Sequence, residues 1–298
     1  MSFMENLIDK AQVLTEALPY IRTFTGKYFV IKYGGQAMVN DELKKTVAQD
    51  IVLLKYIGIN PIVVHGGGKE VTAVSARMGI DAVFAGGLRV TDEESMEVVE
   101  MVLAGKVNQH LVGLINSQGG SAVGLSGKDG HLFVSQKKSP LTVWQKGKQE
   151  KVDLGLVGEI AQVNPQIVFD LCARGYIPVI SSLGVDAGGR NLNINADHVA
   201  GELAGVLQAE KLLLLTDVEG IFGREGEEEK LIARLTKKQA EELIEKEIIK
   251  EGMIPKVESC LKALEKGAKR THIIDGRVKH CMLLEIFTDQ GIGTMVFS

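Results

Sequence analysis

The chain has 298 residues, of which 45% are hydrophobic and 24% are charged. This composition is typical of a folded globular protein, and the length fits one large α/β domain or two closely packed lobes. The formal net charge of -4 leaves no clustered positive charge for nucleic acid or an anionic membrane surface. We therefore expect neither as a partner.

Targeting and metal signals are also missing from the sequence. Acidic and basic residues interrupt the N-terminal segment, and no apolar run approaches the ~20 residues that span a bilayer, so we expect a cytoplasmic protein. The three cysteines and six histidines lack the spacing of metal ligands. This predicts inert thiols and no metal site built by the protein.

Short apolar runs bounded by glycine predict strands, and amphipathic stretches between them predict helices. In chain order, these are a strand at 28–33, a helix at 41–58, strands at 61–65 and 177–182, a helix at 195–208, a strand at 211–216, a helix at 236–248 and a strand at 271–275. Continuous apolar strands joined by helices predict an α/β fold with a mainly parallel sheet covered on both faces. A lobe boundary is expected near residues 205–211.

Two further segments lie between these strands. Thr91 and Glu94 have the spacing of a capping box, and apolar residues continue at helical intervals to Leu114, which predicts a long structural helix. Residues 135–155 are polar, basic and rich in turn formers. They predict an exposed hairpin or loop that covers or gates a site.

In an open α/β sheet, ligands bind beyond the carboxyl ends of the strands. Lys32 lies in an apolar strand that ends at Gly34 and Gly35, although lysine is seldom buried without a partner. At 63–70, "VVHGGGKE" places three glycines between a strand and a helix start, which favours a bound anion. A tight turn is the alternative. The dinucleotide pattern G-x-G-x-x-G is absent there.

Two other helix starts carry polar side chains. Alternation would point Asn193, Asn195 and Asp197 to one side of an extended segment, as a ligand wall, although one of them could simply cap the helix. Lys256 follows Pro255 in a predicted first helical turn. A cation there is unfavourable unless an anion compensates, which points to phosphate, with an ordinary surface lysine as the alternative.

Several segments occur in a fixed order along the chain: "KYGGQAM", "VVHGGGKE", "RVTDEESMEVVEMVLAGKVN", "NLNINADHVA", "LLLLTDVEGI", "GMIPKVE" and "LLEIFTDQGIGTMV". This ordered set resembles the amino acid kinase family from about residue 10 to the end of the chain. Within that family it resembles the members that phosphorylate N-acetyl-L-glutamate. The implied fold is a three-layer αβα sandwich around an open, mainly parallel sheet, with an N-terminal helical extension.

The resemblance implies transfer of the γ-phosphoryl group of ATP to the side-chain carboxylate of N-acetyl-L-glutamate. Such a carboxylate is already ionised at pH 7 and needs no general base. Lys32 and Lys256 match the lysines that stabilise the transferring phosphoryl group, and Asp197 matches the aspartate that orients both. Mg²⁺ is expected to enter on the phosphates of ATP.

The resemblance also implies how the remaining residues divide between ligands. Acetylglutamate is assigned to Gly67, Gly68, Arg89, Asn193 and Asn195, and nucleotide to Lys32, Gly34, Gly35, Thr216, Asp217 and Lys256. The implied parts are an oligomerisation helix at 1–24, a lobe at 25–207 for acetylglutamate and dimerisation, and a lobe at 208–298 for ATP and arginine. One sheet would continue across both lobes.

The N-terminal segment has a run of apolar residues on one helical face: Met4, Leu7, Ile8, Ala11, Leu14, Leu18 and Ile21. Docking on its own sheet is the simplest explanation. The extension resembles that of arginine-inhibited members, in which paired helices link dimers into a hexamer, a trimer of dimers. The resemblance assigns the arginine site to Tyr20, Lys211, His280, Glu285, Gly291 and Gly293.

The chain departs from the family pattern at Gln36, Lys69 and Glu251. Glu251 falls in the expected nucleotide loop, where a carboxylate would repel phosphate. The alternative functions are another amino acid kinase, of the glutamate 5-kinase or aspartate kinase type, and a non-catalytic arginine-sensing module. The presence of both lysines argues against the module.

Overall fold

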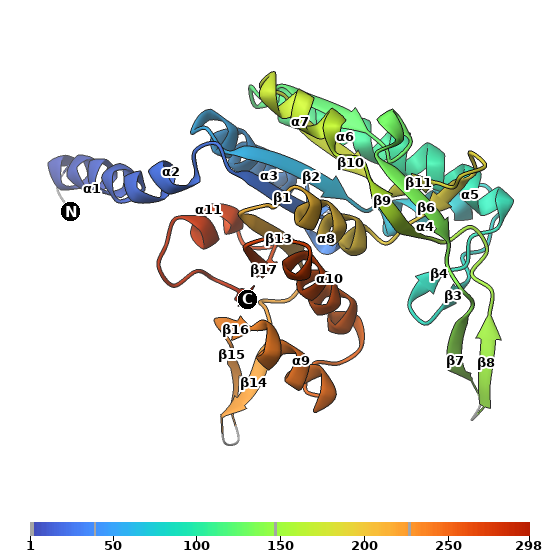
Figure 1. Ribbon diagram of the computed structural model, residues 1–298. Helices are drawn as coiled ribbons and strands as arrows, with labels where there is room; N and C mark the ends of the chain where they lie inside the picture. Colours follow the sequence, from blue (N-terminus) through green and yellow to red (C-terminus); the bar gives the residue numbers. More distant parts are fainter. Residues whose placement is uncertain (1–2, 39, 146–147, 226–227) are drawn as a thin grey trace.

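The computed structural model describes residues 3–38, 40–145, 148–225 and 228–298 (Figure 1). Its α-helices are α1 Phe3–Glu16, α2 Leu18–Phe24, α3 Asp41–Tyr56, α4 Gly68–Arg77, α5 Glu93–Glu100, α6 Asn108–Ser117, α7 Gln166–Ala173, α8 Ala196–Val206, α9 Lys237–Glu245, α10 Ile254–Glu265 and α11 Cys281–Ile286. Short helices of other types are η1 Gly35–Met38, η2 Met101–Val107, η3 Asp129–His131 and η4 Glu251–Met253.

The strands are β1 Tyr28–Tyr33, β2 Asn60–His65, β3 Phe84–Ala85, β4 Leu88–Arg89, β5 Ala122–Leu125, β6 Phe133–Lys137, β7 Leu141–Gln145, β8 Lys148–Val152, β9 Gly158–Val163, β10 Ile177–Ser181, β11 Leu183–Val185, β12 Asn191–Asn193, β13 Lys211–Thr216, β14 Phe222–Glu225, β15 Glu228–Leu231, β16 Arg234–Thr236, β17 Arg270–Asp275 and β18 Thr294–Phe297. Eight of them form the main sheet in the order β16-β18-β17-β13-β1-β2-β10-β5. Its pairs are parallel except β17 with β18. The sheet is continuous across the expected lobe boundary, because β1 pairs with both β2 and β13.

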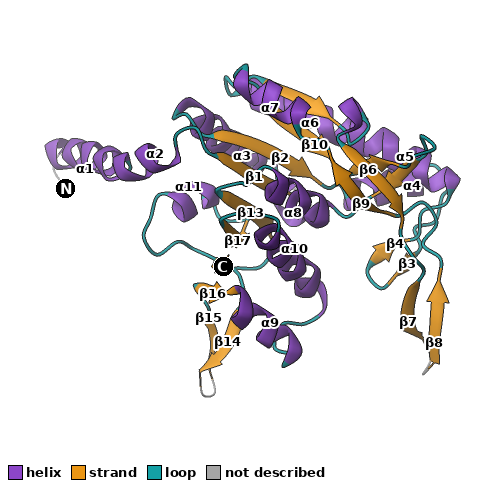
Figure 2. Cartoon of the chain, viewed as in Figure 1, coloured by secondary structure: helices purple, strands orange, loops and turns teal. Residues whose placement is uncertain are grey.

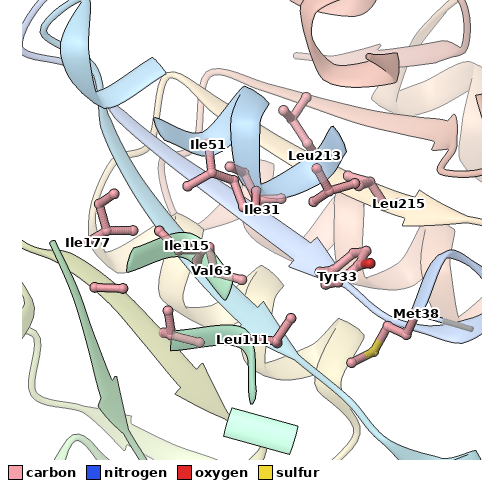
Figure 3. Close-up of a cluster of buried hydrophobic side chains, with 14 of the residues drawn as sticks. Ile31, Tyr33, Met38, Ile51, Val63, Leu111, Ile115, Ile177, Leu213 and Leu215 are labelled. Carbon is pink, nitrogen blue, oxygen red and sulfur yellow. The ribbon is translucent and has the colours of Figure 1, made fainter. Parts of the chain in front are cut away.

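Helices cover both faces of this sheet, which confirms the predicted three-layer α/β fold (Figure 2). Successive strand residues point to opposite faces. In β1, Ile31 and Tyr33 face the layer of α3, α5, α6 and α11, whereas Val30 faces the layer of α7, α8 and α10. Figure 3 shows side chains from the first core: Ile31, Tyr33, Met38, Ile51, Val63, Leu111, Ile115, Ile177, Leu213 and Leu215.

The predicted strands and amphipathic helices are present, and their ends differ by up to three residues from the expected ones. Local capping explains two of the helix starts. Asn40 accepts hydrogen bonds from the N–H groups of Glu42 and Leu43 before α3. Thr236 and Gln239 form a reciprocal capping box before α9.

The predicted capping box at Thr91 and Glu94 is wrong by one residue. Asp92 is the N-cap of α5 and accepts from the N–H of Ser95. The side chain of Thr91 is fully buried, and its backbone pairs with the loop at Leu154 and Leu156. Aspartate caps a helix as well as threonine does, so spacing alone could not choose between them.

The long helix itself is confirmed, as a run of α5, a π-helical segment (η2) and α6 over 93–117. By length and composition alone, this helix could cross a membrane, although no apolar run of that length stands out in the sequence. However, Val99, Leu103 and Ile115 are buried in the core shared with the main sheet. The packing is that of a core helix.

The exposed hairpin or loop predicted at 135–155 is confirmed for 141–152 as β7 and β8, whose connecting residues 146–147 lie outside the described part of the chain. Residues 135–137 instead belong to β6, which pairs with β9. The hairpin extends from the smaller sheet β12-β11-β6-β9, near the β3–β4 hairpin (Figure 1). Leu141 and Val152 pack with Ala85 and Leu88, so the base of one hairpin contacts the other. A covering or gating role stays a prediction.

The N-terminal helix α1 extends away from the body of the molecule (Figure 1). Its apolar residues Leu7, Val13 and Leu14 are 43%, 64% and 72% exposed, so they do not dock on the chain's own sheet. The following helix α2 does dock, because Phe24 is buried against Phe29 of β1.

Candidate active site

A cavity of about 720 Å³ lies at the carboxyl ends of the central strands. It brings together segments that are far apart in the sequence: the end of β1, the glycine loop after β2, the β3–β4 hairpin and the turn from β12 into α8. The predicted residues on its wall are Lys32, Gly34, Gly35, Gly67, Gly68, Arg89, Asn193, Asn195 and Asp197. This is where the open α/β fold places ligands.

Lys32 and Lys256 meet at one carboxylate. The Nζ of Lys32 lies 2.8 Å from Oδ1 of Asp197, and the Nζ of Lys256 lies 3.1 Å from Oδ2. The side chains of Lys32 and Asp197 are 11% and 7% exposed. Lys32 shares a sheet face with Val30, so strand alternation directs it toward α8 and α10.

The carboxyl group of Asp197 is ionised at neutral pH. Burial alone would raise its pKa, but the two ammonium groups outweigh this effect and lower the pKa to about 2. The result is a compact charge arrangement with one more positive than negative charge. Such a surplus can accept a further anion.

Helices α8 and α10 hold these groups in place. Gly201 lets α8 approach α10 closely, because a Cβ there would lie 2.7 Å from the carbonyl oxygen of Ser259. Pro255 occupies the first turn of α10, as predicted. The extended ligand wall is only partly correct: β12 ends at Asn193, Asn195 caps α8, and Asp197 lies in the first helical turn.

The glycine loop opens helix α4, with Gly67 at the N-cap position. The first N–H groups of a helix have no partner within it and bear partial positive charge, so this end favours an anion. Next to this loop, Gly34 lies so close to Lys32 that a Cβ would be 3.2 Å from its Nζ. Gly35 has φ +67°, a conformation that favours glycine.

Arg89 and Asn193 belong to one network on the cavity wall. Arg89 donates from Nη2 to the carbonyl oxygen of Gly68 and to Thr72, and its guanidinium lies 4.8 Å from the ring centre of Phe84. Asn193 donates to the hydroxyl of Thr91 at 3.2 Å, and this hydroxyl donates to the carbonyl oxygen of Arg89 at 3.2 Å. Thr91 therefore supports the site, although the sequence analysis treated it only as a helix cap.

The predicted nucleotide residues Thr216 and Asp217 are not on this wall. Thr216 is the last residue of β13 and Asp217 follows it at the same edge of the sheet, where the N–H of Gly276 donates to the carbonyl oxygen of Thr216. Thr216 is buried and Asp217 is exposed. The side chain of Glu251 lies outside what the structure describes.

A second cavity, of about 810 Å³, lies between α2 and the segment after α11. Tyr20 lines it and donates to Asp289 at 2.5 Å. Beneath it, the ammonium of Lys211 lies 5.5 Å from the ring centre of Phe24. Glu285 accepts from the N–H groups of Ile292 and Gly293, and Gly291 is adjacent, since a Cβ there would lie 2.7 Å from its carboxylate.

The structure does not bring His280 into this group. Its Nδ1 lies 2.6 Å from Oδ1 of Asp50, on α3. His272 lies there instead, with Nε2 3.0 Å from Nζ of Lys211 and Nδ1 2.6 Å from Glu285. Burial lowers the pKa of His272 to about 4, so the neutral ring donates to Glu285 and accepts from Lys211.

Comparison with known proteins agrees with this geometry. The model of the amino acid kinase family matches residues 27–275. The chain is 56% identical over 288 residues to the acetylglutamate kinase of Pelotomaculum thermopropionicum, covering 97% of this chain and 98% of that one. It is 53% identical over 293 residues to the acetylglutamate kinase of Methanocaldococcus jannaschii, covering 98% of each.

Among solved structures, the fold is similar to N-acetylglutamate synthase from Neisseria gonorrhoeae complexed with coenzyme A and N-acetyl-glutamate. The TM-score is 0.81 at 28% identity, and the match covers 100% of this chain but 64% of that one. The same synthase complexed with coenzyme A and L-arginine gives a TM-score of 0.73 at 26% identity, covering 100% and 66%.

The chain belongs to the amino acid kinase family. It is a phosphotransferase, and the relatives that it matches along nearly their whole length are acetylglutamate kinases.

Proposed function

We propose that the protein transfers the γ-phosphoryl group of ATP to the γ-carboxylate of N-acetyl-L-glutamate, forming N-acetyl-L-glutamyl 5-phosphate for arginine biosynthesis. The observation that carries this proposal is the pairing of Lys32 and Lys256 through Asp197, which lines the cavity at the ends of the central strands. More than half of the residues are shared with acetylglutamate kinases, which further supports it.

The chemistry requires positive charge and positioning rather than a base. An acceptor carboxylate and a polyphosphate repel one another, and the negative charge is redistributed as the phosphoryl group moves. Lys32 and Lys256 would offset this charge from two sides. Asp197, with its pKa lowered to about 2, stays ionised and keeps the ammonium groups oriented, so it acts as an organiser.

The acetylglutamate would lie against the glycine loop and the Arg89 network. The planar guanidinium of Arg89 suits the α-carboxylate. Asn193 would form hydrogen bonds with the acetamido group or the α-carboxylate of the substrate. The N–H groups of Gly67 and Gly68 would meet the reacting carboxylate or the phosphoryl oxygens, with Asn195 fixing the adjoining helix start.

ATP would approach from the α10 side, with Gly34 and Gly35 next to its phosphates and Thr216 and Asp217 near its ribose and base. We propose that Mg²⁺ is carried by the phosphates, because Asp197 is already committed to two ammonium groups. When bound, the metal would neutralise phosphate charge.

The test is to incubate the protein with MgATP and N-acetyl-L-glutamate and to trap the acyl phosphate with hydroxylamine. We expect hydroxamate from the parent protein and a loss of ~10²- to 10³-fold in Lys32→Ala, as for removal of a transition-state contact. The exposed Lys128→Ala serves as a matched control and should retain activity. No hydroxamate from the parent would refute the proposal.

The same assay separates the alternative functions. Hydroxamate from free glutamate or aspartate, but not from the acetylated substrate, would identify a kinase of the glutamate 5-kinase or aspartate kinase type. Arginine binding without phosphoryl transfer to any of these acceptors would identify a non-catalytic arginine-sensing module.

We also propose feedback inhibition by L-arginine in the cavity between α2 and the segment after α11. Tyr20 lines this cavity, and Lys211 contacts the ring of Phe24, which also lines it. Glu285, with Gly291 and Gly293 beside it, could pair with a guanidinium. The likeness to a synthase complexed with L-arginine supports this proposal. Millimolar arginine should inhibit the parent protein, and Glu285→Gln should need at least ~10-fold more. Equal sensitivity would exclude Glu285 from the site.

We propose separate roles for three segments of the chain. Residues 1–24 would oligomerise the protein, 25–207 would bind acetylglutamate and dimerise, and 208–298 would bind ATP and arginine. The exposed apolar residues of α1 support a hexamer that pairs these helices between dimers. We propose a cytoplasmic location, as for other enzymes of amino acid synthesis.

A further inference from the structure

His65 is the last residue of β2 and immediately precedes the glycine loop, yet it is fully buried. It points to the sheet face covered by α6, where it meets Asn108, the first residue of that helix. Its Nδ1 lies 2.9 Å from the carbonyl oxygen of Gly66, and its Nε2 lies 3.1 Å from Nδ2 of Asn108. Neither residue has a role in the reaction proposed above.

The surrounding groups fix which ring nitrogen carries the proton. Nδ2 of Asn108 also lies 2.9 Å from the carbonyl oxygen of Val179 and 3.3 Å from that of Leu125, so this atom must be the amide nitrogen. It donates to Nε2 of His65, which leaves the proton on Nδ1. The Nδ1–H therefore donates to Gly66. Burial lowers the pKa of His65 to about 4, so the ring is neutral at physiological pH.

This contact sets the direction of the next peptide group. The carbonyl of Gly66 and the N–H of Gly67 belong to one planar trans peptide and point in opposite directions. Because His65 holds the carbonyl toward the buried side, the N–H of Gly67 points away from the imidazole. Gly66 and Gly67 both line the cavity, so that opposite side is the cavity side. The N–H of Gly67 donates to no group in the described part of the chain.

Two more contacts restrain the loop. The N–H of Gly66 donates to the carbonyl oxygen of Tyr33 at 3.3 Å, so both polar groups of Gly66 are bound. A Cβ on Gly67 would lie 2.7 Å from Leu103 and 3.2 Å from Val107. Both side chains come from the π-helical segment that ends just before Asn108. π-Helical turns often occur at functional sites.

We propose that His65 is a positioning residue for phosphoryl transfer: with Asn108 fixing its tautomer, it holds the Gly66 carbonyl so that the Gly67 N–H faces the reacting anion. This inference rests on the proposed function. The positioning role depends on one atom, Nδ1. A variant that keeps a donor at this place can therefore be compared with one that only fills the same volume.

Two conservative variants test the contacts of Nδ1 and Nε2 separately. In His65→Asn, the side-chain amide can take the place of Nδ1–H and donate to Gly66, and Asn108 keeps Val179 and Leu125 as acceptors. In His65→Gln, the longer side chain reaches toward the place of Nε2 and loses the donor to Gly66. Glutamine is nearer to histidine in volume, so a purely structural role would make His65→Gln the milder change.

The measurement is kcat and KM from the hydroxamate assay, with the melting temperature of each variant. Removing one hydrogen-bond donor to an oxyanion lowers kcat ~10²- to 10³-fold, and moving that donor out of position lowers kcat by a smaller factor. We therefore expect His65→Gln to lower kcat at least ~10-fold, with KM for ATP changed less than ~3-fold. His65→Asn should retain kcat within ~3-fold, and the exposed His110→Gln should match the parent.

Equal kcat in the two variants, or a higher kcat in His65→Gln, would overturn the proposal. If neither variant folds, Asn108→Ala decides, because it removes the donor to Nε2 of His65 and changes no residue of the loop: kcat should fall ~3- to 10-fold, and an unchanged kcat would overturn the proposal. A parent protein that forms no hydroxamate would instead refute the proposed function, so the two failures are distinguishable.

Discussion

Replacing Asp197 by asparagine removes one charge and almost no volume. In the parent protein this carboxylate holds Lys32 at 2.8 Å and Lys256 at 3.1 Å, and its side chain is 7% exposed. In Asp197→Asn, two partly buried ammonium groups lie close together without a counter-ion. Both the stability of the fold and the geometry of the lysines should suffer.

The size of the stability loss follows from the pKa. Asp197 is lowered from an ordinary value of 3.8 to about 2 by the two lysines, against the effect of burial. At ~1.4 kcal/mol per pH unit, this difference corresponds to roughly 2–3 kcal/mol of unfolding free energy at neutral pH. Because the folded-state pKa is the lower one, the contribution is complete above pH 4 and is lost as the pH falls toward 2.

ATP should reverse part of this loss. Its phosphates can pair with the two lysines that asparagine leaves uncompensated, so ATP should raise the melting temperature of Asp197→Asn more than that of the parent. At the same time kcat should fall by ~10²-fold, because the ammonium groups are no longer oriented. Thermal unfolding with and without ATP, together with the hydroxamate assay, measures both effects.

The same helix offers a matched control. Glu202 is buried on α8 and pairs with Lys262 at 2.6 Å and Lys266 at 2.5 Å, away from the cavity. Glu202→Gln should lower stability without a larger response to ATP and without loss of kcat. Our account of the Asp197 centre is refuted if Asp197→Asn keeps kcat within ~3-fold, or if ATP stabilises it no more than it stabilises the control.

Three further predictions concern other parts of the molecule. Burial raises the pKa of Asp50 from 3.8 to about 6 despite its contact with His280, so its carboxyl group destabilises the fold progressively as the pH rises from 4 through 6. Asp50→Asn should therefore gain up to ~3 kcal/mol over the parent in urea unfolding at pH 7.5 and little at pH 4, and an equal gain at both would contradict this. Arg89→Lys should raise KM for N-acetyl-L-glutamate ~10- to 100-fold with KM for ATP little changed, and parallel changes would exclude a substrate-specific contact. Removal of residues 1–16 should convert a hexamer into dimers in analytical ultracentrifugation, and an unchanged sedimentation coefficient would rule out α1 as the link.

Much of the fold could be predicted from local patterns. The apolar runs at 28–33 and 211–216 coincide with β1 and β13, because strands buried on both faces need continuous apolar sequence. Local patterns do not select the cap of the long helix. Thr91, Asp92 and Glu94 all suit a helix start, and only the fold commits Thr91 to the support of Asn193.

The contacts of two histidines could not be predicted from the sequence. The resemblance assigns His280 to the arginine site, but its side chain contacts Asp50 on α3 instead. His272 lies inside an apolar strand and resembles any other core residue in the sequence. Its contacts with Lys211 and Glu285 come from three separate elements, so no local spacing could reveal them.

By itself, the sequence determined the alternation of strands and helices and the residue types of the active site, because both depend on local periodicity and on motifs of a few residues. Only the tertiary structure decided which of these residues meet. Asp197 is 165 residues beyond Lys32 in the chain, and their 2.8 Å contact depends on the order in which β1 and the α8 layer pack. Packing of the strands and helices also places Nδ1 of the buried His65 against the carbonyl oxygen of Gly66 in the glycine loop.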